Sequence, residues 1–393
     1  MTTSAQPLQG IRILEVGGYV SSPYGTSILC ALGAEVVKVE RTAEGDDFRR
    51  KLNDKSPYWV QVNTGKRSLA VDLKAPEGAA LVRALIPRFD VLVENLRPGK
   101  LAAMGLGREA CLELNPQLIY VSVTGFGDGG PLEQRPAYDT IGQAFGGLYT
   151  ILGDQGAPQL TGTIIADLIT GLTTASGVLA ALVGRERTGV AAGVQTSILE
   201  AVSSLTVDAV SQYNDTGSDP HRTSRHPQAQ NFCVRTSTDD HLVVHMSSSE
   251  KFWQNFAVAL GRPELATDPR FATFFDRERS YRELTEIVEA EFLTRSTDEW
   301  EKRLTEGDVP FAPVLTVSRL LNHPQTAWLG LVTPDARGQA LIGAPWRFDG
   351  ERPPRSPHAT VVGEDTRAVA GEVLTADEID RCLADGVLFE PPA

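Results

Sequence analysis

The residue whose type and setting most suggest chemistry in this sequence is Asp167, in the stretch GTIIADLITG. Its neighbours Ile164, Ile165 and Leu168 are apolar, and an ionised carboxylate among such side chains loses hydration unless something satisfies it. A desolvated carboxylate is a better nucleophile than a hydrated one. The plain structural alternative is a first-turn acid that favours the helix dipole, and the residue alone leaves both interpretations open.

A dinucleotide site is a second possibility, because Glu40 follows Gly17-Gly18 by about twenty residues, as an acid that holds a ribose hydroxyl would. However, the first turn reads GGYVSSP and lacks the pattern G-x-G-x-x-G. The stretch GFGDGG (125–130) has that pattern, but PLEQRP follows it instead of a helix whose N-terminus could hold phosphate. Plain turns are therefore the favoured interpretation of both stretches.

Other reactive constellations have little support. His241 and His245 are four residues apart, but LVV between them is typical of a strand, and no third ligand is nearby. We therefore expect no metal. The sequence has no G-x-S-x-G and no cysteine with a histidine close in sequence, so a conventional hydrolase triad is not indicated.

The elements that must position Asp167 follow an alternating pattern of short apolar runs and helical stretches. The runs lie at 11–16, 35–40, 68–73, 90–96 and 118–126. Strands that alternate with helices of about 10–15 residues predict a parallel α/β sheet. Apolar residues then recur at helical spacing over 165–182, and we expect another helix at 196–209.

A polar segment rich in turn formers, residues 212–232, predicts a crossing between domains. Beyond it we expect a strand at 241–247, helices at 251–260, 280–294 and 297–305, and an amphipathic helix near 375–384. The apolar window 164–184 holds Asp167 and several Thr, Ser and Gly residues, so it predicts a buried helix and no membrane span.

Charge and cysteine content restrict the partners and the compartment. The net charge is -13 over 393 residues, which argues against nucleic acid, whose binding requires a basic face. An anionic ligand must therefore meet local positive charge. Four scattered cysteines without a C-x-x-C pair indicate free thiols in a reducing compartment, and no signal peptide is visible, so we expect a cytoplasmic protein.

A set of stretches, taken in order, resembles the class III CoA-transferase family, also called formyl-CoA transferase-like or carnitine dehydratase-like. The resemblance runs from Leu8 to about Leu388. The matching stretches are LQGIRILEV, LGAEVVKVER with GDDFR, NTGKRSLAVDLK, DVLVENLRPG, LNPQLIYVSVTGFGDGGP, PAYDTIGQAFGGL, the Asp167 segment, RTG..AGVQTSILEA and VPFAPV.

The resemblance implies an α/β fold: a Rossmann-like parallel sheet in a large domain, a smaller inserted α+β domain, and an interlocked homodimer. It implies a large domain over 1–214, a small domain over 215–325 and a C-terminal segment, 326–393, that returns to the large domain. It further implies that Asp167 is the nucleophile that attacks an acyl-CoA, giving an aspartyl anhydride and then an aspartyl-CoA thioester that an acceptor acid attacks.

The resemblance also places coenzyme A contacts, which lie beyond the carboxyl ends of strands as ligands of parallel sheets do. They are Val20, Arg41, Val71, Lys74, Asn95, Leu96, Tyr138 and Asp139. Arg41 and Lys74 supply basic groups for the anionic CoA.

Two departures from the family pattern concern specificity. Many relatives carry a basic residue where this chain has Ala103, and Arg97 is our candidate substitute. The formyl-CoA transferase type has a glycine run that acts as a lid, whereas this chain reads SRHPQAQNF at 224–232, which puts oxalate/formate specificity in doubt.

Two alternatives to the transferase remain. The first is a 2-methylacyl-CoA racemase of the same family. Racemases carry a His at the position of Tyr138, so one of two bases is missing here. The second is a catalytically inactive CoA-binding scaffold, against which the presence of Asp167 argues.

Overall fold

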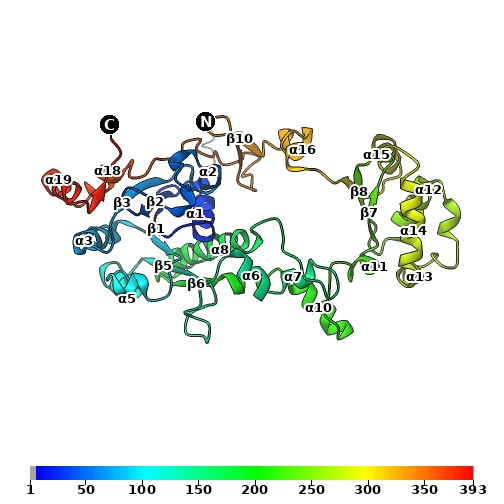
Figure 1. Cartoon of the computed structure of the whole chain (residues 1–393), viewed down its shortest axis with the longest axis horizontal. Coiled ribbons are helices and arrows are strands. Elements are labelled where there is room, and N and C mark those ends of the chain that lie inside the picture. Colours follow the sequence, from blue (N-terminus) through cyan, green and yellow to red (C-terminus); the bar gives the residue numbers. More distant parts are fainter. Residues whose placement is uncertain (1–5, 393) are drawn as a thin grey trace. The chain divides into compact units, whose positions relative to one another are not determined.

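The computed structural model describes residues 6–392. The chain divides into two compact units (Figure 1). The larger unit runs to Leu148, resumes over Thr161–Val207 and returns from His323 onward, and the smaller unit consists of Tyr149–Leu160 and Asp208–Asn322. The domain boundaries expected near residues 214 and 325 stay predictions.

The larger unit is built on a seven-stranded sheet in the order β12-β3-β2-β1-β4-β5-β6. All neighbouring strands are parallel except the antiparallel pair β12–β3. The fold is therefore mixed α/β around a sheet that is mainly parallel, as predicted. The strands are β1 (Arg12–Val16), β2 (Glu35–Glu40), β3 (Arg67–Val71), β4 (Val91–Glu94), β5 (Ile119–Thr124), β6 (Val194–Ser197) and β12 (Leu388–Phe389).

The two edge strands of this sheet differ from the sequence prediction. The helix expected at 196–209 is wrong, because its first residues belong to β6 and a break separates α9 (Ile198–Ser203) from α10 (Val207–Thr216). β6 is only half-buried, so it lacks the apolar run by which the central strands were found. β12 has two residues, too few to produce any periodicity.

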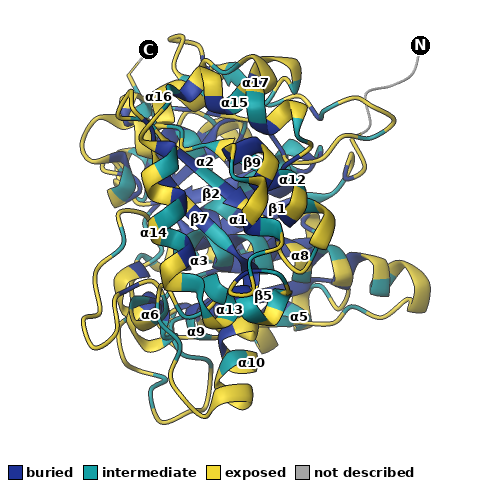
Figure 2. Ribbon diagram, turned by 90° about the vertical axis from the view of Figure 1, so that its right-hand side faces the viewer, coloured by how far each residue is buried: buried dark blue, intermediate teal, exposed yellow. Residues whose placement is uncertain are grey.

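Helices cover both faces of the sheet, and the strands β1 and β2 are dark blue, meaning buried, in Figure 2. One face packs against α1 (Ser21–Ala31) and α8 (Ile165–Thr188), and the opposite face packs against α3 (Pro76–Leu85), α5 (Arg108–Leu114), α18 (Thr366–Ala370) and α19 (Ala376–Ala384). Burial on both faces explains why most residues of β1, β4 and β5 are apolar.

The larger unit has further short elements around this sheet. They are α2 (Pro57–Asn63), α4 (Lys100–Ala103), α6 (Asp139–Phe145), α17 (Pro324–Trp328), β10 (Val332–Pro334) and β11 (Ala340–Ile342). β10 and β11 form a separate antiparallel pair.

Helix α8 is the one helix among the described residues that is long and apolar enough to cross a membrane by length and composition. Core helices of water-soluble proteins meet the same criterion. In this structure Ala175, Val178 and Leu182 of α8 pack into the core beneath β1, β4 and β5, so this apolar surface is used for packing on the sheet.

The smaller unit has a three-stranded antiparallel sheet covered by helices. Its core contains Trp253, Phe256, Phe292 and Trp300, all fully buried. The predicted strand at 241–247 is β8, and the three predicted helices are α12, α14 and α15. The elements are most of α7 (Leu148–Ile151) and of α10, with α11 (His226–Ala229), β7 (Asn231–Arg235), β8 (His241–His245), α12 (Glu250–Leu260), α13 (Phe274–Arg279), α14 (Tyr281–Phe292), α15 (Thr297–Glu306), β9 (Phe311–Pro313) and α16 (Val317–Leu321).

Candidate active site

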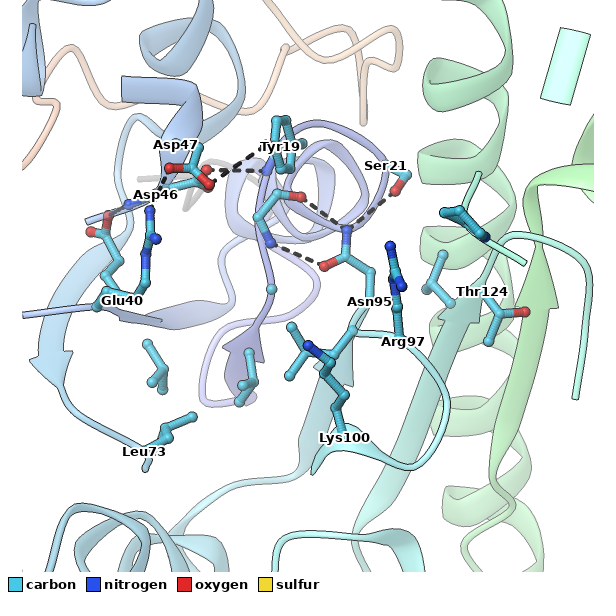
Figure 3. A pocket seen from close by; sticks show the side chains of 18 of the residues that line it. Tyr19, Ser21, Glu40, Asp46, Asp47, Leu73, Asn95, Arg97, Lys100 and Thr124 are labelled. Atoms are coloured by element: carbon cyan, nitrogen blue, oxygen red, sulfur yellow. Dashed lines mark hydrogen bonds and ion pairs between the residues drawn. The ribbon is translucent and has the colours of Figure 1, made fainter. Parts of the chain in front are cut away.

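A cavity of about 760 Å³ opens at the carboxyl ends of β1 to β5 in the larger unit. Figure 3 shows side chains from several of these strand ends around it. Seven of the nine site residues predicted from the sequence line this cavity. They are Arg41, Val71, Lys74, Asn95, Leu96, Tyr138 and Asp167.

The side chains of the other two predicted residues are not among those that line the cavity. Val20 is buried immediately before α1, and Asp139 is buried as the first residue of α6. Asp139 is oriented by Gln143, whose side-chain N–H donates to the Asp139 carboxylate at 2.6 Å. Its carboxylate is thus held in one orientation beside the start of α8, and its contact with CoA stays a prediction.

Asp167 occupies the first turn of α8, where backbone N–H groups have no helical partner. The carboxylate of Asp139 accepts two of these groups, from Ala166 at 2.9 Å and from Asp167 at 3.2 Å. Burial raises the pKa of Asp167 to about 7, and the negative charge of Asp139 adds to the rise. At neutral pH Asp167 is thus a carboxyl group close to half ionised, far more basic than an exposed aspartate.

The position of Asp167 is set by a close crossing of α1 over α8. A Cβ added to Gly171 would lie 2.9 Å from the carbonyl oxygen of Ser21, and one on Gly25 would lie 2.8 Å from that of Gly171. Only glycines permit this approach. Since Gly171 is one turn beyond Asp167, the crossing brings the start of α1 beside the first turns of α8.

The turn Gly17–Tyr19 forms the cavity wall that leads into α1. Asn95, at the end of β4, binds both polar backbone groups of Gly18: its oxygen accepts the Gly18 N–H at 3.0 Å and its amide donates to the Gly18 carbonyl at 2.9 Å (Figure 3). A Cβ on Gly17 would lie 2.2 Å from the Asn95 oxygen. The glycine pair is therefore explained by this clamp and needs no nucleotide phosphate.

Glu40 lines the cavity but cannot easily serve as a ribose-binding acid. Its carboxylate pairs with Arg49 at 2.6 Å and also accepts the hydroxyl of Ser68 and the backbone N–H of Asp46. After GFGDGG the next helix is α6, which begins only at Asp139. Both observations agree with the interpretation of these stretches as turns.

Positive charge gathers in the cavity of this acidic protein. Arg41 pairs with Asp47 and lies 3.9 Å from Glu44. The other basic residues of the cavity form no ion pair with any residue in the range 6–392, and Figure 3 shows Arg97 and Lys100 on the segment that follows β4. They are Lys74, Arg97, Lys100 and Arg135. Unpaired cations in one cavity provide a local site for an anionic ligand.

The structure also shows where Ala103 lies, the position at which many relatives carry a basic residue. Ala103 is exposed and does not line the cavity, whereas Arg97 and Met104 do. Arg97 is therefore placed to contact a ligand in this cavity.

Tyr138 and Tyr19 form an aromatic pair at the cavity, with ring centroids 5.5 Å apart and edge-to-face geometry. Burial and a hydrogen bond with Tyr138 raise the pKa of Tyr19 to about 12. A phenol with such a pKa stays protonated at neutral pH and is a poor base. This pair does not replace the missing imidazole of a racemase.

Several cavity residues were not predicted from the sequence, among them Tyr19, Ser21, Asp46, Thr124 and Arg135. Tyr19 has a φ of 62°, a left-handed conformation that no local sequence motif predicts. Arg135 lies in PLEQRP, and its place three residues before Tyr138 is the signal that could have identified it. In the described part of the chain no group of three His, Cys, Asp or Glu residues is arranged to hold a metal ion.

Comparisons with known proteins point to one family. The model for CoA-transferase family III matches residues 8–366. The chain is 32% identical to a succinyl-CoA:glutarate CoA-transferase of Mus musculus over 98% of this chain and 91% of the relative. It is 33% identical to an acetyl-CoA:oxalate CoA-transferase of Acetobacter aceti over 94% of this chain and 97% of the relative.

A solved structure agrees with these matches. A CAIB/BAIF family protein from Brucella suis has a TM-score of 0.82 and 30% identity, covering 95% of this chain and 100% of that chain. The chain therefore belongs to CoA-transferase family III and is an enzyme of the CoA-transferase type.

Proposed function

We propose that this enzyme transfers coenzyme A from an acyl-CoA to a free carboxylic acid through covalent intermediates on Asp167. The observation that carries the proposal is the placement of Asp167, a half-buried carboxylate with a raised pKa that lines a cavity also holding four unpaired cations. The cavity volume of about 760 Å³ is in the range of small-molecule sites.

The first half of the reaction forms a thioester on the enzyme. A carboxylate oxygen of Asp167 attacks the thioester carbonyl of the donor, the C–S bond breaks, and a mixed anhydride and the CoA thiolate result. The thiolate then attacks the Asp167 carbonyl of the anhydride, and the donor acid leaves as its carboxylate. The energy of the original thioester is kept in the aspartyl-CoA thioester, provided that water is excluded.

The second half reverses these steps with the acceptor. The acceptor carboxylate attacks the aspartyl-CoA thioester and forms a new anhydride while the thiolate leaves. The thiolate attacks the acceptor carbonyl, which restores the Asp167 carboxylate. No net proton transfer is required, which agrees with a cavity in which Tyr19 stays protonated and no histidine is among the lining residues.

Each tetrahedral intermediate requires hydrogen-bond donors for its oxyanion. The backbone N–H groups of Val20, Ser21 and Ser22 meet this need, because no residue in the described range accepts a hydrogen bond from them. Ser21 lines the cavity with Asp167, and α1 begins beside the first turns of α8. We assign the oxyanion site to the start of α1.

The CoA phosphates are expected to bind the unpaired cations at the ends of β3 and β4, Lys74, Arg97 and Lys100.

The proposal also includes an interlocked homodimer, supported by exposed apolar side chains of the larger unit at Ile141, Phe145 and Ile164. Light scattering of the purified protein tests the dimer. The small domain at 215–325, the cytoplasmic location and the absence of membrane and nucleic-acid partners remain part of the proposal.

The deciding experiment uses mass spectrometry on enzyme mixed with an acyl-CoA and then with hydroxylamine. We expect a hydroxamate on Asp167, and no adduct and no turnover with Asp167→Ala, while CoA binding is retained. Normal transfer by Asp167→Ala would remove the mechanism. An unlabelled Asp167 in an enzyme that binds CoA would favour the inactive scaffold, and racemisation of a 2-methylacyl-CoA without acceptor would favour the racemase.

The acids are found by pairing acyl-CoA donors with free-acid acceptors and detecting the new thioester. Succinate, glutarate and oxalate are the first acceptors to include, because the relatives named above carry these acids in their names. A parallel assay with acetate or propionate as the acceptor tests whether the acceptor needs a second carboxylate.

A further inference from the structure

A set of buried charges lies directly beneath the turn Gly17–Tyr19. The register of β1 on β2 places Glu15 opposite Lys38. The Lys38 ammonium lies 2.6 Å from Glu15, 3.0 Å from Asp46 and 2.9 Å from the carbonyl oxygen of Gly17. All three side chains are buried. Because an unpaired buried charge is strongly unfavourable, these groups hold one another in a single arrangement.

Further contacts fix this set. Glu15 also pairs with the buried Lys66 at 2.7 Å and accepts the hydroxyl of Thr26 in α1. Burial alone would raise the pKa of Glu15, but Lys38 and Lys66 outweigh it and bring the pKa down to about 2. Glu15 is therefore ionised at neutral pH, and Lys38 keeps its ionic partner there.

Asp46 connects this set to the turn. Its carboxylate accepts the backbone N–H of Tyr19 at 3.2 Å and that of Phe48 at 2.9 Å, and its own N–H donates to Glu40 at 3.0 Å. Figure 3 shows Asp46 facing the Tyr19 end of the turn. Lys38 thus holds Asp46, and Asp46 holds Tyr19.

The turn needs such support because of its conformation. Tyr19 has a φ of 62°, which is disfavoured for a residue with a side chain and persists only where the surroundings impose it. With Lys38 on Gly17, Asn95 on Gly18 and Asp46 on Tyr19, each residue of the turn has a bound backbone group. The next residue is Val20, where the free N–H groups at the start of α1 begin.

We propose that Asp46, held by Lys38, is a positioning residue that fixes the Gly17–Tyr19 turn and through it the backbone N–H groups of Val20 and Ser21 beside Asp167. This inference rests on the proposed function, since those N–H groups matter only if an oxyanion forms at Asp167. It assigns a role in the rate of acyl transfer to a buried lysine of β2 and a buried aspartate of the loop that follows β2.

The test measures kcat, KM and the dissociation constant of the acyl-CoA for Asp46→Ala, which removes the acceptor of the Tyr19 N–H. We expect kcat to fall on the order of 10²-fold, as when an oxyanion donor is lost, with KM and the dissociation constant changed by less than about threefold. The double variant Lys38→Met/Asp46→Asn lacks the ion pair and the hydrogen bond from Lys38 to the Gly17 carbonyl, but it keeps an amide oxygen for the Tyr19 N–H, so only part of the lost rate is expected to return. It is expected to recover kcat by about tenfold over Asp46→Ala.

If Asp46→Ala does not fold, Asp46→Asn alone takes its place. Its NH₂ group must face either Lys38 or the Tyr19 N–H, so by exchanging one atom it weakens one of the two contacts that link Lys38 to Tyr19 through residue 46. The matched control is Glu35→Gln, which removes ion pairs with Arg12 and Arg67. These two arginines begin β1 and β3, at the amino ends of the strands, whereas the cavity lies at the carboxyl ends. It is expected to lower stability and leave kcat within about twofold.

The proposal is overturned if Asp46→Ala keeps normal kcat, if the double variant is as slow as Asp46→Ala, or if Glu35→Gln loses kcat to the same degree. Trapping of the aspartyl adduct in the unmodified enzyme tests the proposed function by itself, so a failure of the positioning role can be told apart from a failure of that function. An enzyme that forms the adduct at Asp167 while Asp46→Ala is fully active contradicts only the positioning role.

Discussion

The Asp139 carboxylate accepts the backbone N–H of Asp167 at 3.2 Å and that of Ala166 at 2.9 Å. It therefore caps α8 from a different helix and at the same time places a negative charge beside the proposed nucleophile. Both effects disfavour the ionised form of Asp167 and so raise its pKa. The cap occupies donors that would otherwise stabilise its ionised form, and the charge disfavours that form directly.

Asp139→Asn is expected to shift the acid limb of the pH profile of kcat/KM to lower pH. The substitution removes the like charge and keeps an oxygen that can accept the α8 N–H groups. Part of the elevated pKa of Asp167 is expected to remain, because burial is its larger cause. Profiles from pH 5 to 9 for both enzymes provide the measurement. The control is Gln143→Met, which loosens Asp139 without changing its charge. If the acid limb does not move in Asp139→Asn, the charge of Asp139 does not contribute to the raised pKa of Asp167.

The unmodified enzyme is expected to acylate more slowly below about pH 7. Asp167 attacks only as a carboxylate, and its pKa is about 7, so the ionised fraction rises with pH through that value and then levels. A single-turnover measurement of adduct formation between pH 5.5 and 8.5 reports this step apart from product release. A flat rate over that range would mean that Asp167 ionises well below pH 5.5.

Asp167→Asn is expected to stabilise the fold at alkaline pH. The folded pKa of about 7 exceeds the ordinary 3.8, so folded Asp167 binds a proton more tightly and its contribution to stability falls as pH rises from 4 to 7. The gain at pH 8 is expected to be about 2 kcal/mol, below the ~4 kcal/mol that the two pKa values allow at ~1.4 kcal/mol per pH unit. Urea unfolding at pH 8 and pH 5 measures it, and an equal gain at both values argues against ionisation as the cause.

The parts of this site that the sequence predicted are those with a local pattern. The apolar runs that became β1 to β5 and the helical spacing of α8 place the ends of the strands and Asp167 without any knowledge of pairing. The set of contacts that joins Glu15, Lys38, Asp46 and Tyr19 is different in kind. It depends on the register of β1 on β2, on the path of the chain after β2 and on the left-handed turn at Tyr19. None of these has a periodic signal, and neither has the two-residue strand β12.

Arg97→Gln is expected to weaken acyl-CoA binding without changing the chemical step. Arg97 lines the cavity and forms no ion pair with residues 6–392, so its charge is available to a phosphate. We expect KM for the acyl-CoA to rise about five- to tenfold with kcat within about twofold, and binding to depend less on salt. Titration at two ionic strengths measures this. Arg108→Gln, in the neighbouring smaller cavity, is the control, and an equal loss there would show that only the net charge matters.

Two glycines of α8 provide a matched test of the helix crossing that places Asp167. Gly171→Ala puts a Cβ 2.9 Å from the carbonyl oxygen of Ser21 and 2.7 Å from the ring of Tyr24, so α1 and α8 must separate. We expect a loss of about 1–3 kcal/mol in stability and a lower kcat.

Gly184→Ala is the counterpart in the same helix, where an added Cβ meets nothing within 4 Å. It is expected to raise stability by about 0.5–1 kcal/mol through helix propensity and to leave kcat unchanged. Thermal unfolding and kcat for both variants test the pair. If Gly171→Ala is as active and as stable as Gly184→Ala, the close approach of α1 to α8 does not position the nucleophile, and the proposed oxyanion donors of α1 would have no defined relation to Asp167.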